Sequence, residues 1–186
     1  CVGRSFVRRH RGARPTTVPG SVPPTDVVIE FADSTDAATL TELWVDLAVD
    51  QRRHGSHLLA EPNRTVIRET MLRHVVTDTA CVARRDGSIV GFVTFDVETE
   101  RYRQDVSRGV IYNVYVRPGH RDSGIGHGLL AEAEAALQAE DVDTVSLQVM
   151  AENDGARRFY RRHGYDTHRV ELEKPINSDP QSGNDG

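Results

Sequence analysis

The chain has 186 residues, a length that suits one globular domain with terminal segments. No run approaches the roughly 18 apolar residues that span a bilayer, so no membrane partner is expected, and Cys1 and Cys81 form no disulfide or ligand pattern. The net charge is −5, although residues 1–26 are basic, with five arginines and one aspartate. The remaining residues are therefore strongly acidic, and an acidic domain is a poor partner for nucleic acid.

The two ends of the chain differ in composition from its middle. Residues 1–26 are rich in Arg, Pro, Thr and Gly without apolar periodicity, which predicts a disordered segment. Residues 175–186 are polar and predict a flexible tail. The folded domain is therefore expected over residues 27–174. The basic N-terminal segment could also serve as an arm that binds nucleic acid or an acidic partner.

Strand and helix patterns alternate between these ends. Asp86-Gly87 stands between two apolar runs, which is a strong hairpin signal. The segment 99–108 is polar and predicts a loop. The expected order is β-α-α-β-β-β-α-β-α-β, an α/β domain with a mixed sheet. Its strands are expected at 27–32, on either side of Asp86-Gly87 within 80–98, at 110–116, 144–150 and 165–173, and its helices near 40–47, at 63–76, after 124 and at 154–163.

The segment Val110–Leu130 is the most informative part of the sequence. It reads as an apolar strand, a tight turn, a glycine-rich loop and the start of an amphipathic helix. A helix N-terminus presents unpaired N–H groups at the positive end of the helix dipole, and this arrangement binds phosphate. Gly124-Ile125-Gly126-His127-Gly128 lacks the last glycine of the dinucleotide fingerprint G-x-G-x-x-G, and no Gly-Lys-Ser/Thr follows for a Walker loop.

Two motifs together resemble the signatures of the GNAT acetyltransferase superfamily. Arg121-Asp122-Ser123-Gly124-Ile125-Gly126 is similar to its R-x-x-G-x-G/A acyl-CoA loop. Asn153 to Tyr165 is similar to its N-x-x-A-x-x-F-Y-x-x-x-G-F segment, with Tyr165 in place of the usual Phe. The element order also matches, so the resemblance covers roughly Val27 to Glu173. It implies the GNAT N-acyltransferase fold, a central twisted mixed sheet flanked by helices.

The resemblance implies that acetyl-CoA is the co-substrate. Its pyrophosphate would lie on the N–H groups of the loop, since glycine lets the backbone approach closely. Its pantetheine arm would lie beside the strand and in contact with Asn153, where the strand splays from segment 144–150. Tyr160 would act as the general acid on the departing thiolate. The expected cofactor-binding residues are Val114, Val116, Arg121, Asp122, Ser123, Gly124, Ile125, Gly126, His127, Gly128 and Asn153.

Several features leave alternatives open. Arg121 could support the turn or contact phosphate. Many similar proteins place a carboxylate base on the strand before the glycine loop, where this chain has Asn113, an amide that cannot act as a base. The remaining possibilities are a water chain or one of the carboxylates Glu42, Asp46, Asp50, Asp96 and Glu98. The eight histidines form no metal-binding pattern, so no metal is expected, although His54 and His57 lie where acceptors enter in similar proteins.

The sequence therefore predicts a cytoplasmic N-acetyltransferase that moves acetyl from acetyl-CoA to a primary amine by direct attack in a ternary complex. The amine could belong to a small molecule or a protein, because carboxylates and arginines are mixed in the segments that set the acceptor, 42–62 and 99–108. Homodimers are common among similar proteins. The alternative function is a GNAT-like module that binds acetyl-CoA as a sensor without catalysis, which Asn113 would explain.

Overall fold

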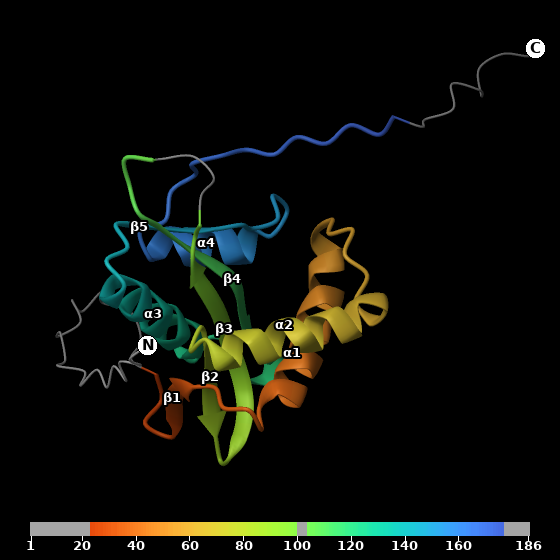
Figure 1. Ribbon diagram of the computed structural model, residues 1–186. Coiled ribbons are helices and arrows are strands. Elements are labelled where there is room, and N and C mark those ends of the chain that lie inside the picture. The colour runs from red at the N-terminus through yellow and green to blue at the C-terminus, as the bar shows by residue number, and fades with distance from the viewer. Residues whose placement is uncertain (1–22, 100–103, 177–186) are drawn as a thin grey trace, which may run out of the picture. The chain divides into compact units, whose positions relative to one another are not determined.

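One mixed sheet of five strands organises the protein, in the order β1-β2-β3-β4-β5 (Figure 1). The computed structural model describes residues 23–99 and 104–176. The first four strands pair antiparallel and β5 pairs parallel with β4. The strands are β1 (Val27–Phe31), β2 (Ala80–Arg85), β3 (Ser88–Val97), β4 (Arg108–Val116) and β5 (Thr144–Leu147).

Within residues 23–99 and 104–176, four α-helices and three short 3-10 helices accompany the sheet. The α-helices are α1 (Ala37–Gln51), α2 (Arg64–Val76), α3 (Ile125–Ala139) and α4 (Asp154–Arg162), and the 3-10 helices are η1 (Arg52–His54), η2 (Glu61–Asn63) and η3 (Pro118–His120). The chain divides into two compact units between Asn153 and Asp154, so α4 belongs to the second unit. The predicted α/β class with a mixed sheet and flanking helices is confirmed.

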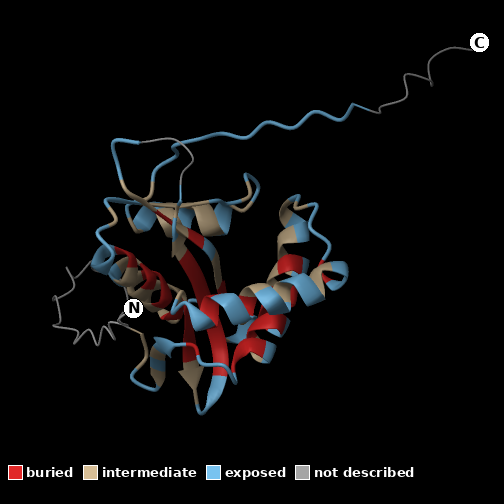
Figure 2. Ribbon diagram, in the orientation of Figure 1, coloured by how far each residue is buried: buried red, intermediate tan, exposed pale blue. Residues whose placement is uncertain are grey.

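The two faces of the sheet are covered by different helices (Figure 1). Phe92 of β3 is fully buried in one core cluster with Leu40 and Leu43 of α1 and Met71 of α2. On the opposite face, α3 buries its apolar side, and its residues Leu129 and Leu137 are at most 1% exposed. Figure 2 shows this burial concentrated in the central strands and the inward sides of α1 and α3. Successive side chains of β3 therefore point alternately to α1/α2 and to α3.

Two strand glycines let α3 lie close to the sheet. A Cβ on Gly91 of β3 would lie 2.7 Å from the carbonyl oxygen of Tyr115 and 3.2 Å from a Leu129 methyl carbon. A Cβ on Gly109 of β4 would lie 2.7 Å from the side chain of Leu137. Because both positions face α3, the glycines set the distance between this helix and the sheet, and so the position of its N-terminus.

The turn between β2 and β3 forms as predicted. Asp86 and Gly87 have φ values of 49° and 74°, the left-handed pair that a two-residue type I′ hairpin requires. The helix predicted over 63–76 is also confirmed, as α2.

The predicted strand over residues 165–173 is wrong. These residues form no strand, and Val170 and Leu172 are exposed by 74% and 89%. The predicted strand over 144–150 ends at Leu147. Alternating apolar residues describe which way side chains point, but a strand also needs a neighbour for its N–H and C=O groups. No strand lies within the described residues of the second unit.

We expect Gly91→Ala to destabilise the fold. The added methyl group would meet the backbone oxygen of Tyr115, which cannot move without shifting β4, and overpacking of this kind costs about 1–3 kcal/mol. A fall of several degrees in Tm, measured by thermal unfolding, is the expected result. Gly119→Ala is the matched control, because a Cβ there meets nothing within 4 Å. Equal Tm values for the two variants would contradict the close approach at Gly91.

Candidate active site

The two parallel strands β4 and β5 separate within the sheet. They pair from Arg108↔Thr144 to Ile111↔Leu147, and β4 then continues to Val116. From Tyr112 onward, the edge of β4 that faced β5 has no strand neighbour within the described residues. Val114 and Val116 lie in this section. The divergence therefore exposes backbone hydrogen-bonding groups where the sequence predicted a splayed strand.

A β-bulge lies at the point of separation. Thr94 of β3 pairs with Asn113, but the next residue, Phe95, pairs with Ile111, so Tyr112 is an extra residue on β4. A bulge bends its strand and redirects nearby side chains and backbone groups. Here it places Tyr112 and Asn113 beside α2: the ring centroid of Tyr112 is 5.8 Å from that of His74. The Asn113 amide donates to the Thr94 hydroxyl (Nδ2–Oγ1 2.7 Å).

The glycine loop connects the end of β4 to the start of α3. Asp122 and Gly124 both have left-handed backbone conformations, with φ of 59° and 83°. Ser123 closes the turn, because its hydroxyl donates to the carbonyl of His120 (Oγ–O 2.6 Å). Gly124 is the N-cap of α3, so Ile125 and Gly126 occupy its first turn, where N–H groups have no intrahelical acceptor. This is the geometry of an anion site.

Gly128 lies inside the first turns of α3, close to β1. Its N–H donates to the carbonyl of Gly124 (N–O 3.0 Å) inside the helix, so this group is already used. Its Cα faces β1, where a Cβ would collide with Ile29 and lie 2.9 Å from Pro23. The close approach of β1 explains the need for glycine at this position, and the part of Gly128 in phosphate binding stays a prediction.

Arg121 supports the turn, one of the two roles that the sequence left open. Its Nε donates to the carbonyl of Val116, the last residue of β4 (2.9 Å), and its guanidinium forms an ion pair with Asp50 of α1 (3.1 Å). The guanidinium carbon also lies 5.7 Å from the ring centroid of Tyr115. Arg121 therefore connects the loop to the strand before it and to the helix on the other face.

Most carboxylates considered as bases are paired with arginines. Glu42 pairs with Arg64, and Asp46 lies 3.9 Å from Arg117. Asp50 pairs with Arg53 (3.3 Å) as well as Arg121, and Glu98 lies 3.6 Å from Arg108. Asp96 has no ion pair with a described residue; its Oδ1 accepts from the N–H of Val97 (2.9 Å). Glu100, Arg101 and Arg103 lie outside the described residues.

A buried histidine next to the bulge was missed by the sequence analysis. His74 of α2 is 2% exposed, and its Nδ1 lies 2.8 Å from the Thr79 hydroxyl. Burial lowers the pKa of His74, with a further lowering from Arg73 and an opposing effect from Asp96. The helical spacing of Met71, His74 and Val75 marks a buried face, but His74 pairs with a residue beyond its helix, which periodicity does not reveal.

Asn153 and Tyr160 lie on either side of the boundary between the two units. Asn153 ends the first unit in a turn, where its N–H donates to the carbonyl of Met150 (2.9 Å). Tyr160 of α4 is part of an aromatic group: its ring centroid lies 5.2 Å from Phe159 and 5.8 Å from Tyr165, both edge-on. Burial raises the pKa of Tyr160 to about 12, so the phenol stays protonated at neutral pH.

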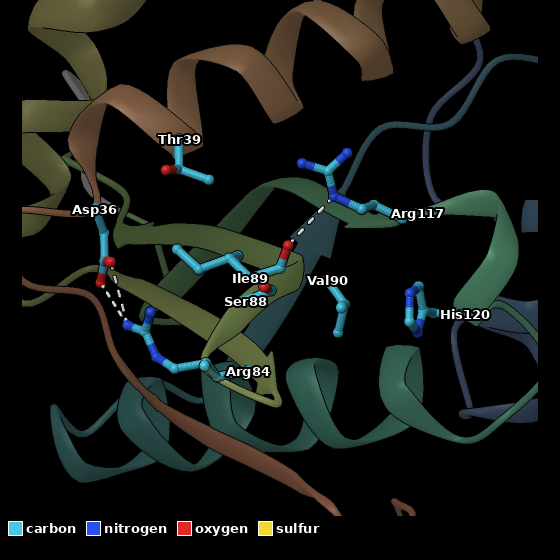
Figure 3. Close-up of a pocket in the computed structure, with 9 residues that line it drawn as sticks. Asp36, Thr39, Arg84, Ser88, Ile89, Val90, Arg117 and His120 are labelled. Carbon is cyan, nitrogen blue, oxygen red and sulfur yellow. Dashed lines mark hydrogen bonds and ion pairs between the residues drawn. The ribbon is translucent and has the colours of Figure 1, made fainter.

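A separate hollow of about 500 Å³ lies beside the β2–β3 turn (Figure 3). Arg84 crosses it to reach Asp36 (3.0 Å), and Nε of Arg117 donates to the carbonyl of Ile89 (3.2 Å). None of the residues predicted to bind acetyl-CoA lines this hollow. Both arginines of the hollow are already bonded to protein groups. The hollow is therefore not assigned to the acetyl-CoA site.

Neither a metal-binding cluster nor a membrane-spanning helix is found among the described residues. Within 23–99 and 104–176, no three histidine, cysteine or acidic side chains come together in a way that could hold a metal ion. Over the same residues, no helix combines the length and apolar character needed to cross a membrane.

The comparisons with known proteins agree on one family. The sequence profile of the acetyltransferase (GNAT) family matches residues 41–165. Mycothiol acetyltransferases of Streptomyces avermitilis and Streptomyces griseus are 33% and 37% identical to the chain over 91 residues. The match covers 49% of this chain and 28% of each relative, so the chain spans less than a third of their length.

Solved structures share the fold. A GCN5-related N-acetyltransferase from Ralstonia eutropha superposes with a TM-score of 0.66 at 22% identity, over 81% of this chain and 98% of that one. The PaiA N-acetyltransferase from Thermoplasma acidophilum, solved in complex with coenzyme A, gives a TM-score of 0.62 at 19% identity, over 78% and 92%. At these identities the likeness concerns the fold alone.

We expect His74 to make the fold sensitive to acid. Its pKa is lower in the folded protein than the ordinary value of about 6.5. The folded state therefore binds fewer protons than the unfolded state, and the free energy of unfolding falls as pH falls below about 6.5. Urea unfolding at pH 7.5 and 5.5 should show a larger loss of stability in wild type than in His74→Gln.

The control for this measurement is His168→Gln, which changes an exposed histidine. It should retain the wild-type loss of stability between the two pH values. If His74→Gln lost as much stability as wild type, His74 would not be the group responsible.

Proposed function

Because the chain belongs to the acetyltransferase (GNAT) family, we propose that it transfers acetyl from acetyl-CoA to a primary amine by direct attack in a ternary complex. One observation carries this proposal: the exposed edge of β4 runs directly into the glycine-rich N-terminus of α3. An extended amide-containing arm and a pyrophosphate are the two parts of coenzyme A that these features suit.

The donor would lie along this path. The pyrophosphate would accept hydrogen bonds from backbone N–H groups at the positive end of the α3 dipole. These N–H groups belong to Asp122, Ser123, Gly124, Ile125, Gly126 and His127. The pantetheine amides would pair with the backbone of Val114, with the N–H of Val116, whose carbonyl already accepts from Arg121, and with Asn153. Arg121 would act indirectly, because its contacts with Val116 and Asp50 hold the loop.

The reaction requires two proton losses from nitrogen. The acceptor ammonium first releases a proton to water, and the free amine attacks the thioester carbonyl carbon. The developing oxyanion would accept a hydrogen bond from the N–H of Val114, next to the bulge. Collapse breaks the C–S bond, the nitrogen gives up its second proton, and coenzyme A leaves as a thiol, with one net proton released.

Tyr160 would stabilise the departing sulfur. A phenol with a pKa of about 12 is a weaker acid than a thiol, whose pKa is about 8.5. Complete transfer of its proton to the thiolate would therefore be uphill. We propose that Tyr160 donates a hydrogen bond to the sulfur while the proton that completes the thiol comes from the collapsing intermediate or from water.

Catalysis is favoured over a role as a sensor, because the curated relatives are acetyltransferases by name. Their name also favours a small-molecule amine over a protein amine as the acceptor. The buried free thiol of Cys81, whose pKa burial raises to about 12, fits a reducing compartment, and we propose the cytoplasm. A homodimer, a catalytic domain over residues 27–174, and flexible segments at 1–26 and 175–186 stay predictions.

The proposal is tested by thiol release from acetyl-CoA in the presence of a panel of primary amines. Gly126→Asp places a carboxylate where the pyrophosphate would lie, and we expect it to raise the Kd of acetyl-CoA at least about tenfold, measured by calorimetry. An acidic residue in the first turn is compatible with a helix, so the fold should persist. Gln138→Glu is the control, since it adds one negative charge at the exposed C-terminal end of α3.

Tyr160→Phe should lower kcat about tenfold, because one hydrogen bond to the leaving sulfur is lost in the transition state. The Kd of acetyl-CoA should change less than about twofold. Tyr165→Phe removes a hydroxyl from the neighbouring ring of the same aromatic group and should retain kcat. Full turnover by Tyr160→Phe, under conditions in which chemistry limits the rate, would refute the assignment.

A further inference from the structure

Asp96 differs from the other carboxylates near the β4 opening because no arginine of the described residues pairs with it. Glu42, Asp46, Asp50 and Glu98 each have an arginine within 4 Å. No ion-pair partner within the described residues reaches Asp96, and its only hydrogen bond comes from the adjacent N–H of Val97. A half-buried carboxylate that has no countercharge within the described residues would gain from pairing with a cationic ligand.

The sheet register places Asp96 on the face covered by α1 and α2. Its neighbour Val97 pairs with Gly109, and a Cβ on Gly109 would point at Leu137 of α3. Because successive residues point to opposite faces, Asp96 points away from α3, on the same side as Thr94 and Phe92. Asp96 pairs with Val110, one residue before the last β4–β5 pair and two before the bulge at Tyr112. It therefore lies opposite the last paired part of β4, just before the opening that begins at Tyr112.

An aromatic ring accompanies the carboxylate. Tyr112 is 53% exposed, and its ring lies against His74. Tyr112 lies two residues beyond Val110, the β4 partner of Asp96. Burial raises the pKa of Tyr112, with a smaller rise from Asp96. A carboxylate next to an aromatic face is a suitable environment for an ammonium group, through charge attraction and cation–π contact.

The other charged groups facing Asp96 do not remove this preference. Glu98 and Arg108 form an ion pair with each other. His74 stays neutral at pH 7 because burial lowers its pKa. Arg73 of α2 is exposed, and it acts on the same two rings as Asp96: it adds to the lowering of the pKa of His74 and opposes the rise in the pKa of Tyr112.

We infer that Asp96 and the ring of Tyr112 bind the ammonium group of the acceptor and so select cationic primary amines, an inference that rests on the proposed acetyl transfer. Asp96 acts as a specificity-determining residue in ground-state binding. It takes part in no bond change: the ammonium proton passes to water, and the amine so formed is already held at the β4 opening for attack.

The test begins with the full chain, acetyl-CoA and a panel of amines at pH 7.5: spermidine, L-alaninamide and L-alanine, with hydroxylamine as an uncharged nucleophile. The cationic amine with the highest kcat/KM is taken forward. Asp96→Asn keeps the oxygen that accepts from Val97 and should fold as wild type. We expect it to raise the KM of the cationic amine about tenfold, with kcat changed less than about twofold.

Two further readouts separate recognition from a structural effect. Raising the salt concentration should increase the wild-type KM for the cationic amine and have little effect on the Asp96→Asn variant, because screening acts on the ion pair. The KM of hydroxylamine should be the same in both proteins. Glu98→Gln is the matched control just beyond the end of β3, two residues after Asp96, and it should retain the wild-type KM, since Glu98 lies within 4 Å of Arg108.

The inference is overturned if Asp96→Asn leaves the KM of the cationic amine unchanged, raises that of hydroxylamine equally, or behaves like Glu98→Gln. Turnover of no amine by the wild-type protein would contradict the proposed function itself and remove this inference with it. Turnover in wild type with no effect at Asp96 would leave the proposed function in place and refute only the recognition site.

Discussion

The separation of β4 from β5 after Ile111 is the constraint on which the candidate site depends. If the two strands remained paired to Val116, the backbone groups of Val114 and Val116 would be satisfied within the sheet and unavailable to a ligand. Parallel strands joined by a helix normally stay paired along their length. Here β5 ends at Leu147 while β4 continues, and the bulge at Tyr112 marks the change. The opening therefore exists because β4 is longer than β5.

The rest of the first unit holds the two ends of this opening in place. Gly91 and Gly109 let α3 pack closely against the sheet, which positions the helix N-terminus at the end of β4. Arg121 joins that loop to Val116 and, through Asp50, to α1 on the other face. An exposed ion pair alone contributes little to stability. Its value here is geometric, because one guanidinium fixes the loop relative to two elements.

How far the sequence predicts this site depends on the range of the interactions involved. The hairpin at Asp86-Gly87 and the loop before α3 follow from residues that are adjacent in the chain, and both form as predicted. The role of Arg121 depends on Asp50, which is 71 residues away, and no local pattern reveals such a partner. Gly128 belongs to a recognisable loop, yet its contact is with Ile29 of β1. The strand predicted over residues 165–173 is wrong for the same reason. Alternating apolar residues indicate which face of a strand is buried, but they do not show whether another strand lies beside it.

The charges around the opening also follow from contacts between distant elements. The sequence alone shows a mixture of acidic and basic residues that favours no acceptor. In the fold, Glu42, Asp46, Asp50 and Glu98 each have an arginine of α2, β4 or the following loop within 4 Å, so each has a nearby countercharge. Under the proposed function, the donor side would be a row of backbone dipoles suited to phosphate, and the acceptor side would keep the Asp96 carboxylate near the ring of Tyr112. Because an ammonium and a pyrophosphate have opposite charge, each half of the opening favours one substrate and disfavours the other, so the two substrates of a ternary complex would be kept in their own places.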